Sequence, residues 1–349
     1  MPFALSAIGA RALMPVLTSI MVAALALAPE ARAAATDDAP AHKRGQGTPQ
    51  GPPPSAMQWL ERAATAARTL NYVGTIVYQH GGKVEVSRLA HFAEGGQELE
   101  KLVSLDGSGR EVIRSQGEVR CYYPDAKLVR VEPRTIRNVF PSLSPEQREA
   151  LAKYYDFRKA GVSRVAGREA QSYVFEPKDG QRYGHRFWAD VETGLLLKAL
   201  LVSEHNNIVD QFAFSEITVG PKIDRELVKP TWPAAPPDWQ VKEGSAGEMT
   251  PHDTGWTVTR MPPGFSKIME GYRSLRGKRE PVAHLVFSDG LVAVSVFIEP
   301  LASSPAQGGT LQQGAVNVYS MKVDDQMVTV LGEVPGVTVR QIAMSVAKR

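Results

Sequence analysis

The residues that could do chemistry in this chain are few, and their spacing argues against catalysis. No two of the seven histidines stand two or four residues apart, the spacing that places a pair of zinc ligands on one strand or one helix. The G-x-S-x-G, H-E-x-x-H and G-x-x-x-x-G-K motifs do not occur. Ser345 and Lys348 match S-x-x-K, but no K-T-G motif accompanies them, so chance explains the match. The sequence therefore predicts no enzymatic activity, no metal site and no cofactor.

Basic residues form two clusters, and the sequence leaves the role of these clusters open. They are common on solvated edge strands, where they oppose aggregation, but they could also bind an acidic peptide or a lipid phosphate. The balance of 40 Lys and Arg against 37 Asp and Glu does not indicate nucleic-acid binding. The cluster considered for partner binding is Arg273, Arg276, Lys278 and Arg279; the other is Arg110, Arg114, Arg120, Lys127, Arg130, Arg134 and Arg137.

Apolar and aromatic residues alternate along the first predicted strand. Tyr72, Gly74, Ile76 and Tyr78 share one face of that strand, because successive side chains of a strand point to opposite faces. This face is either ordinary core or the first wall of an apolar cavity that holds a lipid. The four residues are the candidate lipid-binding site.

The elements that position this strand are predicted between residues 55 and 220. Ser55 and Gln58 fit a capping box, and the helix that follows them should bury Met57, Leu60, Ala64, Ala67 and Leu70. Short alternating runs separated by glycine-containing turns then predict an antiparallel meander, interrupted by a second helix from residue 144 to 154. A sheet of this size can bury both of its faces from solvent only if it curls and the helices cover one side. The prediction is an open half-barrel in a mainly β protein with few helices (α+β).

A second, smaller domain is predicted from residue 256 to 349. Residues 221–255 carry prolines and glycines without a periodic run, and we interpret them as a linker without regular elements. Two apolar runs around Asp289-Gly290 predict a hairpin. A closing helix should bury Val339, Ile342, Ala343 and Val346 on one face of a small β-sheet.

The N-terminus predicts export. Residues 1–33 combine an apolar run behind Arg11 with the small-residue triplet ending at Ala33, which is typical of a cleaved secretory signal. Residues 34–54 are rich in Pro, Gly and charge, so we expect a disordered tether. Cys121 is the only cysteine, and no intrachain disulfide is therefore available. We expect a soluble periplasmic protein.

Several spaced motifs resemble the MucB/RseB family of periplasmic negative regulators of sigma-E/AlgU-type envelope stress. The resemblance covers nearly all of the mature chain. It rests on Asn71-Tyr-Val-Gly-Thr75, Trp256-Thr-Val258, Met261-Pro-Pro-Gly-Phe265, the segment from His284 to Pro300, Gly332-Glu-Val-Pro335 and Val339-Arg-Gln-Ile-Ala343.

The resemblance implies a LolA/LolB-like half-barrel joined to a small C-terminal domain. It implies binding to the periplasmic region of a membrane-anchored anti-sigma factor of the RseA/MucA type, which shields that factor from site-1 proteolysis. It also implies release by lipid or lipopolysaccharide and attachment to the inner membrane only through the partner. The sequence leaves a homo-oligomer open. The rival interpretation is a lipid or lipoprotein carrier without a regulatory partner, which would need only the half-barrel.

Overall fold

The N-terminal domain is built on one large sheet. A computed structural model describes residues 54–115, 117–133, 145–243, 249–275, 278, 280–304 and 308–349. Within these residues the strands pair in the order β12-β6-β5-β4-β3-β2-β1-β11-β10-β9-β8-β7. Strands β1 to β11 are Tyr72–His80, Lys83–Glu94, Gln97–Ser104, Glu111–Arg114, Glu118–Tyr123, Leu128–Pro133, Tyr155–Val165, Arg168–Pro177, Gly184–Asp190, Leu196–Val202 and Ile208–Val219.

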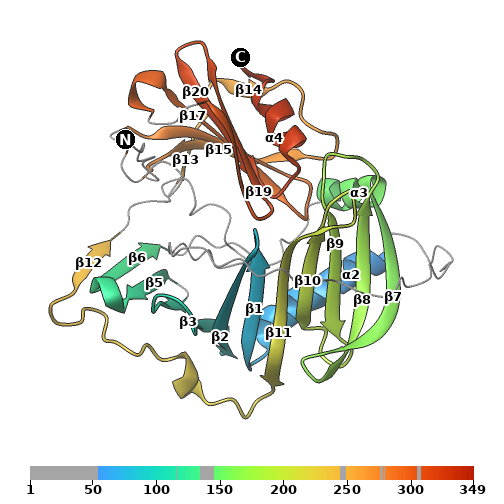
Figure 1. Cartoon of the computed structure of the whole chain (residues 1–349), viewed down its shortest axis with the longest axis vertical. Helices are drawn as coiled ribbons and strands as arrows, with labels where there is room; N and C mark the ends of the chain where they lie inside the picture. Colours follow the sequence, from blue (N-terminus) through green and yellow to red (C-terminus); the bar gives the residue numbers. More distant parts are fainter. Residues whose placement is uncertain are drawn as a thin grey trace.

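This sheet is an open half-barrel, as the sequence predicts. Antiparallel hairpins build each half, and the two halves join where β1 pairs with β11 in the middle of the sheet. The outer strands β7 and β12 have no second neighbour among the described residues, so the sheet does not close (Figure 1).

Two helices accompany the sheet. The helix α2, Pro54–Thr69, packs on one face, and α3, Pro145–Tyr154, contacts β7. The predicted face of the first helix is confirmed in part: Leu60 is buried, and Ala64, Ala67 and Leu70 pack half-buried against the core. The side chain of Met57 lies outside the described residues. Trp59, which the prediction did not include, is also buried. The buried side chains described on α2 are Trp59, Leu60, Ala63 and Ala66.

The segment between the domains contains regular elements, which corrects the prediction of a linker without them. A short 3-10 helix, η3, forms at Arg225–Val228, and Gln240–Glu243 forms β12, which runs parallel to β6. Met249–Pro251 forms β13 and pairs with a strand of the second domain. Every residue of β12 is exposed, so the strand has no apolar alternation that the sequence could reveal. The edge of the neighbouring sheet supplies its hydrogen-bonding partner.

The C-terminal domain is a second antiparallel sheet, in the order β13-β15-β16-β17-β20-β19-β18. The helix α4, Gly336–Ala343, and the pair β14 (Trp256–Val258) and β21 (Val346–Lys348) share one apolar core with this sheet. Two details differ from prediction: β18 was not expected, and Val346 lies in β21 rather than in the closing helix. Strands β15 to β20 are Ser266–Arg273, Val282–Ser288, Ala293–Pro300, Gly309–Gln313, Val316–Val323 and Gln326–Gly332.

The predicted export signal, residues 1–33, lies outside the described residues. So does the predicted tether, residues 34–54, apart from Pro54, which begins α2. In the part of the chain that the structure describes, no helix is long and apolar enough to cross a membrane.

Candidate functional site

The four residues of the predicted apolar face lie at alternate positions of β1, on the side of the sheet that carries α2. Their neighbours on β11 are apolar, since Phe214 lies opposite Ile76 and Phe212 lies opposite Tyr78. Tyr72 and Ile76 belong to the core that also contains Ala66 of α2.

The first half of this face is packed core. Tyr72 is 6% exposed, and its ring stacks on His91 at 4.8 Å between centroids. Its hydroxyl donates to the carbonyl oxygen of Ala67 at 3.3 Å, and burial raises the pKa of this hydroxyl. A Cβ added to Gly74 would lie 2.5 Å from the carbonyl oxygen of Glu216, so only glycine allows β1 and β11 to approach this closely.

The second half of the face is less covered. Ile76 and Tyr78 are half-buried, and both lie toward the end of β1 that meets the C-terminal domain. The Tyr78 hydroxyl donates to Asp210 Oδ2 at 3.0 Å, and its ring stacks on His80. Burial, and then the negative charge of Asp210, raise the pKa of Tyr78. This half of the face therefore lies beside the contact between the two domains.

An aromatic cluster beneath α2 extends the apolar face across the sheet, and the sequence analysis missed it. The ring of Trp59 stacks on Tyr173 with centroids 4.4 Å apart, and it also contacts Phe187 at 5.2 Å and Phe175 at 6.0 Å. The signal that could have revealed it is the helical stripe of Trp59 with two small residues, Ala63 and Ala66. The cluster fixes α2 to the half-barrel.

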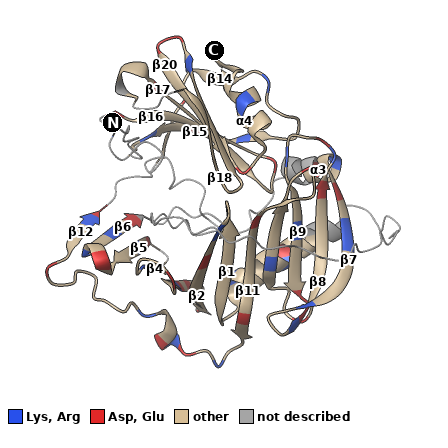
Figure 2. Ribbon diagram, in the orientation of Figure 1, with Lys and Arg blue, Asp and Glu red and all other residues tan. Residues whose placement is uncertain are grey.

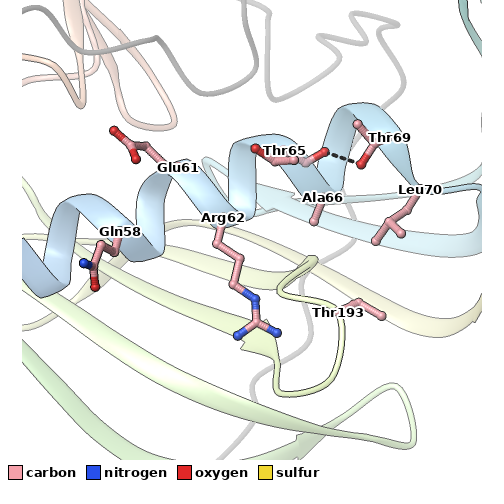
Figure 3. A pocket seen from close by; sticks show the side chains of 8 residues that line it. All are labelled: Gln58, Glu61, Arg62, Thr65, Ala66, Thr69, Leu70 and Thr193. Carbon is pink, nitrogen blue, oxygen red and sulfur yellow. Dashed lines mark hydrogen bonds between the residues drawn. The ribbon is translucent and has the colours of Figure 1, made fainter. Parts of the chain in front are cut away.

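A groove of about 400 Å³ runs along the outer side of α2 (Figure 3). Six of its eight lining residues are polar or charged, and Arg62 points from the helix toward the turn that carries Thr193. Arg62 Nη2 donates to the carbonyl oxygens of Val191 at 3.1 Å and Glu192 at 2.8 Å. These bonds tie the helix to the turn between β9 and β10. The lining residues are Gln58, Glu61, Arg62, Thr65, Ala66, Thr69, Leu70 and Thr193.

The candidate basic cluster is only partly described. Arg273 is 4% exposed in β15, and the Lys278 ammonium pairs with Glu299. Arg276 and Arg279 lie outside the described residues. Basic and acidic residues are interspersed over both domains in Figure 2. The two described members are therefore engaged within the C-terminal domain, and the cluster's role in partner binding stays a prediction.

The most heavily built polar site joins the two domains. Arg182, in the loop between β8 and β9, and Asp289, in the β16–β17 turn, are each 1% exposed. Arg182 Nε donates to Asp289 Oδ2 at 2.8 Å, and the Tyr155 hydroxyl donates to the same oxygen at 2.9 Å. Arg182 also donates to the carbonyl oxygen of Pro263, and its guanidinium lies 4.9 Å from the ring centroid of Phe265.

The Asp289 carboxylate has a second role in its own turn. Its Oδ1 accepts the backbone N–H groups of Leu291 and Val292, each at 3.0 Å. The Asp289-Gly290 turn was predicted correctly, but its contact with Arg182 was not, because the sequence holds no signal for a pair 107 residues apart. We call this interface the domain seam; it contains Tyr155, Arg182, Pro263, Phe265 and Asp289.

Further hydrogen bonds join the two domains outside the domain seam. Asn317 Nδ2 donates to the Tyr183 hydroxyl at 3.0 Å, and Thr338 Oγ1 donates to the carbonyl oxygen of Gln181 at 2.9 Å. The backbone N–H of Ala315 donates to Asp210 Oδ1 at 3.0 Å. Together these contacts set the orientation of the C-terminal domain on the half-barrel (Figure 1).

The described residues contain no group of three or more His, Cys, Asp or Glu side chains arranged to hold a metal ion. The first domain has an apolar sheet face under one helix, and a buried polar seam joins it to a second domain. This arrangement is that of a two-domain binding protein. The chain belongs to the MucB/RseB family, because residues 55–232 match the MucB/RseB N-terminal domain and residues 250–347 match the MucB/RseB C-terminal domain.

The sequences of several named proteins align with most of this chain. The sigma factor AlgU regulatory protein MucB of Pseudomonas aeruginosa is 34% identical over 308 residues, which cover 83% of this chain and 90% of that protein. The sigma-E factor regulatory protein RseB of Haemophilus influenzae is 28% identical and covers 84% of this chain and 92% of its own. The crystal structure of MucB in complex with MucA(peri) matches with a TM-score of 0.65 and 32% identity, over 84% of this chain and 99% of that chain.

Proposed function

We propose that this protein is a periplasmic regulator that binds the periplasmic region of a MucA/RseA-type anti-sigma factor and shields it from regulated proteolysis. One observation carries the proposal: a relative that aligns with both domains was crystallised in complex with MucA(peri). The match extends over 99% of that chain, so no domain of the relative lacks a counterpart here. The relatives' names as sigma factor regulatory proteins support the same role.

The proposal includes release by lipid or lipopolysaccharide at the face of Tyr72, Gly74, Ile76 and Tyr78. Ile76 and Tyr78 are the half-buried members, so an acyl chain would contact them first. The Tyr78 hydroxyl contacts Asp210, which in turn accepts the N–H of Ala315 from the C-terminal domain. A lipid that displaces Tyr78 would therefore disturb the contact between the domains. This connection gives lipid a physical route to a surface shared by both domains.

A lipid or lipoprotein carrier is the rival function, and the domain seam disfavours it. A carrier would need the half-barrel alone, whereas here a buried ion pair, Arg182–Asp289, orients a second domain. Periplasmic location, peripheral attachment to the inner membrane through the partner, and the lack of enzymatic activity are parts of the same proposal. They rest on family membership and on the predicted export signal.

Limited proteolysis tests the proposal. The anti-sigma periplasmic segment of the same organism is exposed to its site-1 protease with and without the mature protein, residues 34–349. We expect cleavage to slow in proportion to the fraction of segment bound, with an unrelated periplasmic protein as control. Cleavage at an unchanged rate in the presence of excess mature protein would contradict the shielding role.

A further inference from the structure

The segment between the domains is fixed to the half-barrel over most of its length. We call residues 221–243 the strap. Ile223 and Val228 of the strap are buried, and η3, which contains Val228, contacts β2 and β3. The strap ends in β12, which pairs with β6, and the backbone N–H of Gln240 donates to the carbonyl oxygen of Lys127 at 2.8 Å. Figure 1 shows the strap running from β11 past β2 and β3 to β12.

One buried carboxylate holds the middle of the strap. Glu111, on β4, is 1% exposed. Its Oε1 accepts the backbone N–H of Thr231 at 2.8 Å, and its Oε2 accepts the Thr231 hydroxyl at 2.5 Å. Lys101 Nζ, from β3, lies 3.0 Å from the same carboxylate and donates to the carbonyl oxygen of Lys229 at 2.8 Å. Two charged side chains of the sheet therefore find hydrogen-bonding partners in the strap.

Two tryptophans of the strap cover an apolar patch beside this carboxylate. Tyr122 is fully buried, and Trp232 and Trp239 pack against the cluster that contains it. The ring centroids of Trp232 and Tyr122 lie 5.8 Å apart, and those of Trp232 and Trp239 lie 5.6 Å apart. Arg120 Nη1 donates to the carbonyl oxygen of Ala234 at 3.1 Å. Undocking the strap would expose this apolar patch to water, which is unfavourable.

The strap lies on the opposite face of the sheet from the candidate lipid-binding face. Residues that pair directly across antiparallel strands share a face, and the register places Leu102 and Val112 on the face of Gly74. Lys101 and Glu111 precede these two residues in the sequence, so their side chains point to the other face. The strap therefore does not cover the candidate lipid-binding face.

The docked strap shortens the connection between the domains. Glu243 ends β12 in the sheet of the half-barrel, and Met249 begins β13 in the C-terminal sheet. Residues 244–248 lie between them, and a chain of that length spans at most roughly 20 Å. With the strap undocked, the connection would begin after Val219, at the end of β11, and could span roughly 100 Å. Docking of the strap therefore limits how far the domains can part.

We propose that the strap is a lock on the separation of the two domains, and that Glu111 is the residue that holds it. While the strap is docked, a C-terminal domain that leaves the domain seam stays close to the half-barrel and returns to it. The effective concentration of a tethered partner falls roughly with the −3/2 power of tether length, so undocking should lower it about tenfold. The lock goes beyond the proposed function, because it concerns how the domains are joined whatever the protein binds.

Hydrogen exchange of the mature chain, followed by NMR, tests the lock. The Thr231 amide reports docking of the strap, because it donates to Glu111. The Ala315 amide reports the contact between the domains, because it donates to Asp210 of the half-barrel. We expect both amides to be protected in the wild type. Glu111→Ala should remove most of the protection of Thr231 and lower the protection factor of Ala315 about tenfold.

A second variant and a control separate the strap from the sheet beneath it. Trp232→Ala changes the strap alone, and it should lower both protection factors because Trp232 contacts Tyr122. It decides the matter if Glu111→Ala does not fold. Glu100→Gln is the matched control, since Glu100 pairs with Arg114 across the same two strands but on the other face of the sheet. It should leave both protection factors at their wild-type values.

Three results would overturn the lock. The first is a Thr231 amide that is unprotected in the wild type, or that stays protected in the folded variants. The second is a wild-type protection factor for Ala315 in a folded variant whose Thr231 amide has lost its protection. The third is an equal loss at both amides in Glu100→Gln, because that loss would come from a weakened sheet and not from release of the strap.

Discussion

Arg182 and Asp289 form a buried ion pair that crosses from the half-barrel to the C-terminal domain, with Nε 2.8 Å from Oδ2. Both side chains are almost completely shielded from solvent. Arg182 also pairs with Asp179 of its own domain, so Asp289 supplies the charge that crosses between the domains. Removing one partner of such a buried pair is costly because it leaves the other charge poorly compensated.

Asp289→Asn should destabilise the protein by about 3 kcal/mol, because the buried Arg182 would then keep only Asp179, which is partly exposed, as a charged partner. The asparagine oxygen can still accept the turn's N–H groups, so the variant removes charge and leaves the turn intact. Urea unfolding of the mature chain measures the loss. Asp156→Asn is the matched control, since the pair of Asp156 with Lys178 is solvent-exposed and should contribute less than about 1 kcal/mol. Equal effects of the two changes would contradict the role of the buried pair.

His185 should make the protein sensitive to acid. Burial lowers the pKa of His185 to about 4, whereas the unfolded chain binds this proton near pH 6.5. The stability that comes from keeping His185 uncharged is complete above the pKa of this histidine in the unfolded chain. It is lost as the pH falls toward the pKa of His185 in the folded protein. Between pH 7 and pH 4.5 the wild type should lose roughly 2 kcal/mol more unfolding free energy than His185→Gln. Identical pH profiles for the two proteins would show that His185 gains its proton without penalty.

Most strands could be predicted from the sequence because their apolar alternation and glycine turns are local features. The four residues predicted to share the first strand, Tyr72, Gly74, Ile76 and Tyr78, all lie in the observed strand Tyr72–His80. The exposed strand Gln240–Glu243 was missed because a neighbouring edge, and not its own pattern, orders it. The domain seam was missed for a related reason. Nothing in the sequence near Arg182 distinguishes it from a surface arginine, because its partner Asp289 is brought to it only by the fold. The apolar face of β1 was found, but its division into packed and half-buried halves depends on α2 and Asp210.

Ile76→Glu tests the lipid-binding face. A buried acyl chain gains ~0.8 kcal/mol per methylene, and a carboxylate at Ile76 would oppose that burial. We expect the variant to keep its affinity for the anti-sigma segment but to resist release by purified lipopolysaccharide. Ile76→Val is the matched control and should respond like the wild type, provided that circular dichroism shows both variants folded. Release of the segment from folded Ile76→Glu at the wild-type lipid concentration would place the lipid site elsewhere.

The basic cluster predicts salt-dependent binding. If Arg276 and Arg279 meet an acidic partner, affinity for the anti-sigma segment should fall as salt rises, because exposed charges are screened over about 8 Å at physiological ionic strength. The double change of Arg276 and Arg279 to Gln should flatten this dependence. Arg340→Gln, an exposed arginine on α4, serves as control. An unchanged salt dependence in the double variant would show that Arg276 and Arg279 are solvated surface charges that do not bind the partner.

The central claim is binding to an anti-sigma factor, and isothermal titration of the mature protein with the periplasmic anti-sigma segment tests it most directly. The account predicts saturable binding that purified lipopolysaccharide weakens, and lipopolysaccharide binding that the segment weakens by the same factor, because coupling between two sites is reciprocal. No binding of the segment, in a protein that still takes up lipid, would contradict the account and favour a carrier.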